Sequence, residues 1–110
     1  MAAKFTSVDA KTAKVIFDSG AHIIDVRSEA EWSAGHVEGS DRVDPNRVSA
    51  KRVGRADAIV VVCRGGSKSK RVAKKLAKEG YRVYHLKGGL QAWYDAGLSL
   101  VSTNGDRATV

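Results

Sequence analysis

The stretch "AIVVVCRGGSKSK" (residues 58–70) runs from a continuous apolar segment through the only cysteine and a glycine pair into a basic segment. A β-branched run of this kind predicts a strand that is buried on both faces, as central strands of parallel sheets are. The apolar spacing after Ser69 predicts a helix over residues 69–79. We therefore expect Cys63 at the carboxyl end of a central strand, where ligands bind in parallel sheets.

Strand and helix patterns alternate along the chain. Strands are expected at residues 22–26, 58–63 and 82–86, with a small one at 42–44. Helices are expected at residues 10–18, 46–52, 69–79 and 89–96. A further short helix is expected to open with a capping-box spacing from Ser28 to Glu31, run through Trp32 and end at Gly35. This alternation predicts an α/β fold, in which a mostly parallel sheet carries helices on both faces.

The length of 110 residues fits a single domain, for which we expect a core over about residues 4–100 and a flexible tail at 101–110. One cysteine cannot form an internal disulfide, so a reducing compartment, the cytoplasm, is expected. The first twenty residues contain no unbroken apolar run. We therefore expect neither a signal peptide nor a membrane span.

The basic charge is concentrated behind the cysteine. The formal net charge is +7, and residues 64–79 hold seven basic side chains against one acidic side chain. This concentration of positive charge favours an anionic ligand, although Lys70, Lys74 and Lys78 have the spacing of a solvated helix face. A nucleic-acid partner is not expected, because few aromatics interleave the basic residues at 47–55 and no nucleic-acid motif is present.

The loop from Cys63 to Lys68 has the composition of an anion-binding turn. Gly65 and Gly66 allow backbone angles at which successive N–H groups point inward, and the following helix adds its own free N–H groups. With Arg64 and Lys68 beside it, the sulfur is expected to be mainly thiolate at neutral pH. A lone cysteine at a strand end is commonly just a small buried hydrophobe. The coincidence of glycines, cations and a helix start favours the reactive interpretation.

Three segments together resemble the rhodanese homology domain in its single-domain form. They are "IIDVRSEAEWSAGHVEGS" (23–40), "VVVCRGGSKS" (60–69) and "LKGGLQAW" (86–93), and the resemblance covers about residues 4–100. It implies a rhodanese-like fold, a five-stranded parallel sheet flanked by helices. It also implies a thiosulfate sulfurtransferase, in which Cys63 takes sulfane sulfur from thiosulfate as a persulfide and passes it to cyanide or a thiol.

The resemblance also assigns roles to other residues. Backbone N–H groups of residues 64–68 would hold the persulfide, and no metal or organic cofactor is expected. Lys68 stands where many thiosulfate-using relatives have arginine, so donor binding is expected to be weaker. The expected anion-binding loop consists of Arg64, Gly65, Gly66, Ser67, Lys68 and Ser69.

A further group of residues is interpreted as structural support for the site. Asp25 and Arg27 would brace the surrounding loops, and His36 has a hydrogen-bonded structural role rather than that of a base or metal ligand. The supporting residues are Asp25, Arg27, Glu31, His36, Gly88 and Gly89. The last two would let a later loop pass close to the cysteine loop.

Two alternative functions stay open. One is a sulfur-carrier or interaction module that hands the persulfide to a partner protein docked on the basic helix. The other is a phosphatase of the Cdc25 type, which is disfavoured because such enzymes have a loop one residue longer that ends in arginine, where this chain has Ser69. A disulfide reductase is also disfavoured, since the chain has no second cysteine to resolve a mixed disulfide.

Overall fold

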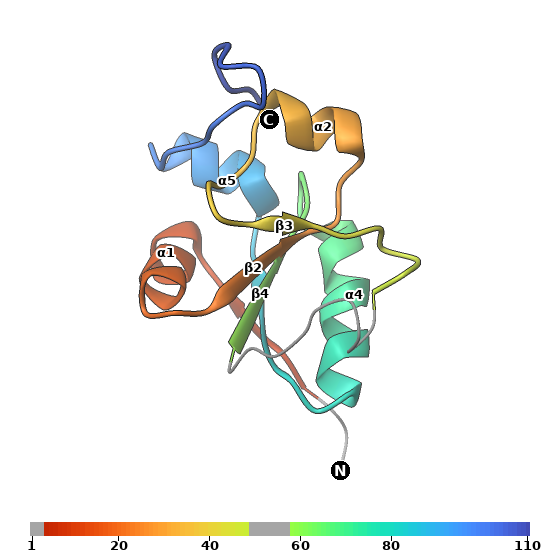
Figure 1. Ribbon diagram of the computed structural model, residues 1–110. Coiled ribbons are helices and arrows are strands. Elements are labelled where there is room, and N and C mark those ends of the chain that lie inside the picture. Colours follow the sequence, from red (N-terminus) through yellow and green to blue (C-terminus); the bar gives the residue numbers. More distant parts are fainter. Residues whose placement is uncertain (1–3, 49–57) are drawn as a thin grey trace.

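A parallel sheet of five strands lies at the centre of the computed structural model, which describes residues 4–48 and 58–110 (Figure 1). The strands are β1 (Thr6–Val8), β2 (His22–Asp25), β3 (Asp41–Arg42), β4 (Ala58–Val62) and β5 (Arg82–Leu86). Their order across the sheet is β1-β5-β4-β2-β3, and every neighbouring pair is parallel. The expectation that residues 58–63 form a central strand is confirmed, because β4 lies between β5 and β2.

Helices cover both faces of this sheet, as the sequence predicted. They are α1 (Ala10–Asp18), α2 (Glu29–Ala34), α4 (Ser67–Lys78) and α5 (Gly89–Asp95). Figure 1 shows α4 on one side of the sheet and α1 on the other. None of these described helices has the length and apolar character needed to cross a membrane.

Side chains along β4 point alternately to the two faces of the sheet, so the buried core consists of two clusters. Ile59, Val61 and Cys63 belong to the buried cluster that includes the inward residues of α4, such as Val72 and Leu76. The intervening residues Val60 and Val62 belong to a second cluster, with Trp93 of α5 and Ala13 of α1. A strand buried on both faces needs apolar residues at every position, which explains the unbroken run in the sequence.

Local capping signals fix the starts of two helices. The carboxylate of Asp9 accepts a hydrogen bond from the Thr12 backbone N–H at 2.8 Å, which caps α1. Ser28 and Glu31 form the expected capping box at the start of α2, each side chain accepting from the other's backbone N–H.

Three elements differ from the sequence expectations. The edge strand β1 was not foreseen, and α4 begins at Ser67 rather than at Ser69. The helix expected at residues 46–52 is not seen over the described part, where residues 45–47 form a turn; its later residues lie outside the described segments.

The carboxyl-terminal segment was expected to be a flexible tail, but it makes specific contacts with the fold. Val101 and His36 exchange two backbone hydrogen bonds of 2.8 Å. The N–H groups of Thr103 and Thr109 donate to carbonyl groups at the end of α2, each at 2.9 Å. Val110 packs against the core cluster that contains Trp93. These contacts place the segment against the domain, and its flexibility stays a prediction.

Candidate active site

Cys63 follows directly after β4, at the carboxyl edge of the sheet. Cys63 continues the series of Ile59 and Val61, whose side chains point to the face of the sheet that α4 covers. Its side chain therefore points toward α4, and the residue is only 4% exposed. The chain then turns through Arg64, Gly65 and Gly66 and enters α4 at Ser67. Because α4 starts immediately beyond the cysteine, its first backbone N–H groups lie close to the sulfur.

Two backbone N–H groups point at the sulfur of Cys63. The amide nitrogens of Gly66 and Ser69 lie 3.1 and 3.3 Å from Sγ. From the sequence we expected the N–H groups of residues 64–68 to surround the sulfur. Among these residues, only Gly66 donates to Sγ in the described hydrogen bonds, and the second donor is Ser69. Backbone N–H groups placed in this way can hydrogen-bond an anionic sulfur, whether of a thiolate or of a persulfide.

The hydroxyl group of Ser69 also reaches the sulfur. Its Oγ lies 3.2 Å from Sγ and 3.1 Å from the Gly66 carbonyl oxygen, and Ser69 is completely buried. In the thiol form the S–H can donate to this oxygen while the hydroxyl donates to the carbonyl. In the thiolate form the hydroxyl hydrogen can turn toward the sulfur instead. Ser69 therefore adapts to either charge state.

A buried histidine that the sequence analysis did not single out holds the loop from behind. His85, at 3% exposure, places Nε2 2.7 Å from the Gly66 carbonyl oxygen and Nδ1 3.1 Å from the Ser7 hydroxyl. Because a carbonyl only accepts, Nε2 carries the proton and donates. Gly66 itself has a φ of +104°, a left-handed conformation that favours glycine. His85 thereby fixes the orientation of the residue whose N–H faces Sγ.

The first turn of α5 lies against the cysteine loop. The N–H groups of Leu90 and Gln91 donate to the carbonyl oxygens of Cys63 and Arg64 at 2.8 and 3.1 Å. A Cβ placed on Gly89 would lie 2.5 Å from the first of these oxygens and 2.3 Å from the second. Gly88, which also has a positive φ, sits at the start of this helix. The backbones approach so closely that only glycine fits at residue 89.

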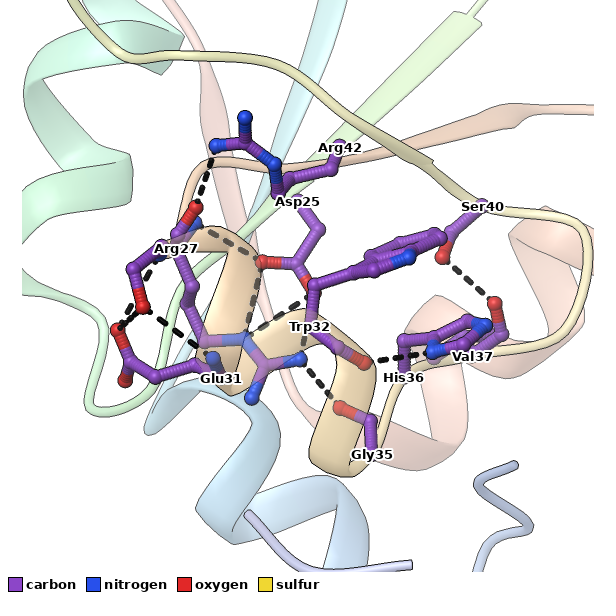
Figure 2. Close-up of polar contacts among 10 residues, drawn as sticks. Asp25, Arg27, Glu31, Trp32, Gly35, His36, Val37, Ser40 and Arg42 are labelled. Atoms are coloured by element: carbon purple, nitrogen blue, oxygen red, sulfur yellow. Dashed lines mark hydrogen bonds and ion pairs between the residues drawn. The ribbon is translucent and has the colours of Figure 1, made fainter. Parts of the chain in front are cut away.

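Asp25 and Arg27 form a buried ion pair at the end of β2 (Figure 2). Nε and Nη2 of Arg27 reach the two carboxylate oxygens at 2.8–3.1 Å, and Nη2 also donates to the Gly35 carbonyl. Arg27 thus ties β2 to the end of α2. Its Nη1 is the one buried side-chain nitrogen or oxygen in the described part of the chain without a hydrogen-bond partner.

Glu31 and His36 lie on or next to α2. Burial alone would raise the pKa of Glu31, but hydrogen bonds from the backbone and hydroxyl of Ser28, with the nearby charges of Arg27 and Lys68, outweigh it and lower the pKa. The ring of His36 stacks on Trp32 at a centroid distance of 3.8 Å, and Nδ1 lies 2.7 Å from the Trp32 carbonyl oxygen. These contacts attach His36 to α2, and its backbone bridge to Val101 attaches it to the carboxyl-terminal segment.

A pocket of about 230 Å³ opens at the cysteine. It is lined by Arg27, Glu31, Cys63, Arg64, Gly65, Ser67 and Lys68. Three of these side chains are cationic and one is anionic, so the pocket favours a small anion. Among the loop residues named from the sequence, Gly66 and Ser69 face the sulfur, while the other four line the pocket.

Comparisons with known proteins agree with this geometry. The family model described as a rhodanese-like domain matches residues 9–96. The thiosulfate sulfurtransferase GlpE of Pseudomonas fluorescens (strain SBW25) is 31% identical over 93 residues, which cover 82% of this chain and 85% of the relative.

Solved structures with a similar fold include a rhodanese-related protein from Thermoplasma volcanium and a rhodanese-like domain from Anabaena. The first has a TM-score of 0.80 at 23% identity and covers 88% of this chain and 98% of its own. The second has a TM-score of 0.79 at 22% identity, and the match covers 97% of this chain and 87% of the Anabaena domain.

Proposed function

This chain belongs to the rhodanese-like domain family, and from that premise we propose that it is a thiosulfate sulfurtransferase that works through a persulfide on Cys63. One observation carries the proposal. The sulfur of Cys63 receives two backbone N–H groups, from Gly66 and Ser69, and borders a small pocket rich in cations. This is an environment for a sulfur that is charged and must stay accessible to a small anionic donor.

In the first half-reaction the Cys63 thiolate attacks the outer sulfur of thiosulfate. A new S–S bond forms to Sγ, the S–S bond of thiosulfate breaks, and sulfite leaves with the bonding electron pair. Arg64 and Lys68 line the pocket and would bind the sulfonate oxygens. Arg27 also lines the pocket, and its buried Nη1 has no hydrogen-bond partner among the residues that the structure describes.

In the second half-reaction an acceptor attacks the outer sulfur of the persulfide. Cyanide would leave as thiocyanate, or a thiolate would leave as a new persulfide, and Cys63 returns to the thiolate. The N–H groups of Gly66 and Ser69 favour this leaving thiolate, because they donate to the charged sulfur. Two displacements through one covalent intermediate give ping-pong kinetics.

The position of Ser69 supports sulfur transfer over phosphate transfer. A phosphatase of the related type would need an arginine at this place in the loop to hold phosphoryl oxygens. Here the residue is a completely buried serine whose hydroxyl contacts Sγ. The loop therefore presents no guanidinium at that position to a tetrahedral anion.

Steady-state assays of wild-type protein and Cys63→Ser test the proposal. Wild type is expected to convert thiosulfate and cyanide to thiocyanate, with parallel lines in double-reciprocal plots, and Cys63→Ser is expected to be inactive. Slow turnover beside a stable persulfide would favour a sulfur carrier for a partner protein. Hydrolysis of a phosphoester without sulfur transfer would overturn the proposal.

A further inference from the structure

A serine and a histidine lie side by side near the carboxyl edge of the sheet, outside the lining of the cysteine pocket. Ser7 of β1 and His85 of β5 are direct partners in the register of these parallel strands, so their side chains share one face of the sheet. The Ser7 Oγ lies 3.1 Å from Nδ1 of His85. Because Ser7 is exposed and His85 is buried, a hydroxyl group open to solvent contacts an imidazole held inside the fold.

The contacts of His85 determine which of its ring nitrogens can act as a base. Nε2 donates to the Gly66 carbonyl oxygen at 2.7 Å, so Nδ1 of the neutral ring has a free electron pair and accepts from the Ser7 hydroxyl. Phe5 packs edge-on against the same ring, at a centroid distance of 5.9 Å and an interplanar angle of 68°. A serine is activated for covalent catalysis when it contacts a base that a third group orients. Here His85 is the base, and the Gly66 carbonyl is the orienting group.

This pair borders a pocket of about 310 Å³. Lys70 of α4 and Lys87, which directly follows β5, also line the pocket, and both are exposed. None of the lining residues that the structure describes is acidic. The pKa of Asp9 is lowered by its hydrogen bonds with Thr12 and, more weakly, by nearby Lys87, but Asp9 does not line the pocket. The pocket therefore places a serine hydroxyl beside two positive charges, which favours an anionic substrate.

We propose that Ser7 and His85 form a second nucleophilic centre, which takes an acyl group from a small acyl phosphate and releases it to water. The two lysines favour an acyl donor whose leaving group is anionic, as phosphate is. The volume of the pocket is that of a small-molecule site. This activity is separate from sulfur transfer, because neither Ser7 nor the two lysines line the pocket at Cys63.

The reaction is an acyl transfer in two balanced steps. In the first, the Ser7 Oγ attacks the acyl carbon and its proton passes to Nδ1 of His85. A C–O bond forms to Oγ, the bond from the acyl carbon to the bridging oxygen breaks, and phosphate leaves with the electron pair and then takes the proton from Nδ1. In the second, water attacks the acyl carbon, and Nδ1 takes a proton from the water and returns it to Oγ as the ester bond breaks. The products are phosphate and a carboxylic acid, and no oxidant or reductant is needed.

The test uses Cys63→Ala as the parent protein, because the Cys63 thiolate is itself a nucleophile. Acetyl phosphate is the probe, and the readouts are phosphate release above the uncatalysed rate and the position of the acetyl group by peptide mapping. Hydroxylamine cleaves an ester on Ser7 but not an amide on a lysine. Ser7→Ala in this parent removes the nucleophile. Thr6→Ala, which removes an exposed hydroxyl one residue earlier on the same strand, is the matched control.

The parent is expected to carry a hydroxylamine-labile acetyl group on Ser7. Ser7→Ala should lower phosphate release about a hundredfold, or to the uncatalysed rate. Thr6→Ala should stay within about twofold of the parent, because its side chain points to the other face of the sheet. A Ser7 hydroxyl that only completes the hydrogen bonds of His85 would form no ester. Acetyl groups on lysines alone, or equal release by Ser7→Ala and the parent, would overturn the proposal.

Lys70→Ala/Lys87→Ala in the same parent tests the preference for an anionic leaving group. This variant should slow acetyl transfer from acetyl phosphate about tenfold and leave transfer from the uncharged p-nitrophenyl acetate within about twofold. Equal slowing with both reagents would overturn the assignment of acyl phosphates as substrates. Turnover of thiosulfate and cyanide, measured with Cys63 intact, tests sulfur transfer separately, so failure of either activity is distinguishable from failure of the other.

Discussion

The carbonyl oxygen of Cys63 accepts a hydrogen bond from the backbone N–H of Leu90 at 2.8 Å. The end of the central strand is therefore tied directly to the first turn of α5. The neighbouring carbonyl of Arg64 is tied to Gln91 in the same way. These bonds hold the two residues that begin the loop, while α4 supplies the N–H groups that face Sγ. The loop is thus fixed from two helices on opposite faces of the sheet.

Substitution of Gly89 should break this arrangement. In Gly89→Ala the new Cβ would lie 2.3–2.6 Å from backbone atoms of Arg64 and Cys63. These backbone atoms can shift only at a large cost in free energy. We expect a loss of about 3 kcal/mol or more in the free energy of unfolding, together with slower sulfur transfer. Urea denaturation measures the first effect and thiocyanate formation the second.

Gly80→Ala provides the matched control for that variant. Gly80 also has a positive φ, but a Cβ there would meet no atom within 4 Å. This control should cost only about 1 kcal/mol, the strain of the backbone conformation. Equal losses in the two variants would show that close packing of α5 on the loop contributes nothing.

Removal of the Ser69 hydroxyl should make the sulfur less reactive. Ser69→Ala keeps the backbone N–H to Sγ but removes the hydroxyl 3.2 Å away, which can donate to the thiolate. A hydrogen bond to a charged group contributes about 1.5 kcal/mol or more, so alkylation of Cys63 by iodoacetamide at pH 7 should slow about tenfold. Ser99→Ala, an exposed change outside the loop and the pocket, should leave this rate unchanged. A rate in Ser69→Ala equal to wild type would contradict the role given to the hydroxyl.

His85 should contribute to both stability and activity. His85→Leu removes the shortest hydrogen bond to the Gly66 carbonyl, at 2.7 Å, and leaves that oxygen only the longer bonds from Ser69 and Lys70. The Ser7 hydroxyl loses its ring partner. The expected loss is about 2 kcal/mol of unfolding free energy, with slower persulfide formation at 25 °C where the variant is still folded. His22→Leu, which changes a partly exposed histidine at the first residue of β2, should leave persulfide formation at the wild-type rate. Normal persulfide formation in His85→Leu would contradict the positioning role.

The pH dependence of the free energy of unfolding should reveal the stabilising contribution of ionised Glu31. Its pKa is lower in the folded protein than the ordinary value of 4.5, so its ionised form stabilises the fold at neutral pH. That contribution is present above pH 4.5 and disappears as the pH falls through the lowered folded-state value. Wild type should therefore be more stable than Glu31→Gln at pH 7, and the difference in unfolding free energy should shrink by pH 3. A difference that grows on acidification would contradict this assignment.

The sequence predicted the elements whose patterns are local. The apolar run of β4, the capping box of Ser28 and Glu31, and the spacing of α4 each depend on residues close in the chain, and each is present. By contrast, β1 has only three residues, all of them exposed or half-buried, so no alternation marks it. The contacts of the carboxyl-terminal segment with the end of α2 and with His36 are backbone hydrogen bonds, which require no particular side chains.

In the site, too, the features set by neighbouring residues were predictable from the sequence, and the contacts between distant residues were not. The loop "CRGGSK" marks the cysteine without any structure, because its glycines and cations are consecutive. The contact of His85 with the loop depends on β5 pairing beside β4, and its contact with Ser7 depends on the register of β1 against β5. Such relationships exist only in the folded chain.

Intact-mass spectrometry after incubation with thiosulfate, in the absence of any acceptor, tests the central claim most directly. Wild-type protein should gain the mass of one sulfur atom, localised to Cys63 by peptide mapping and removed by cyanide. Cys63→Ser should gain nothing. An unchanged mass in the wild type, or an equal gain in Cys63→Ser, would contradict the account.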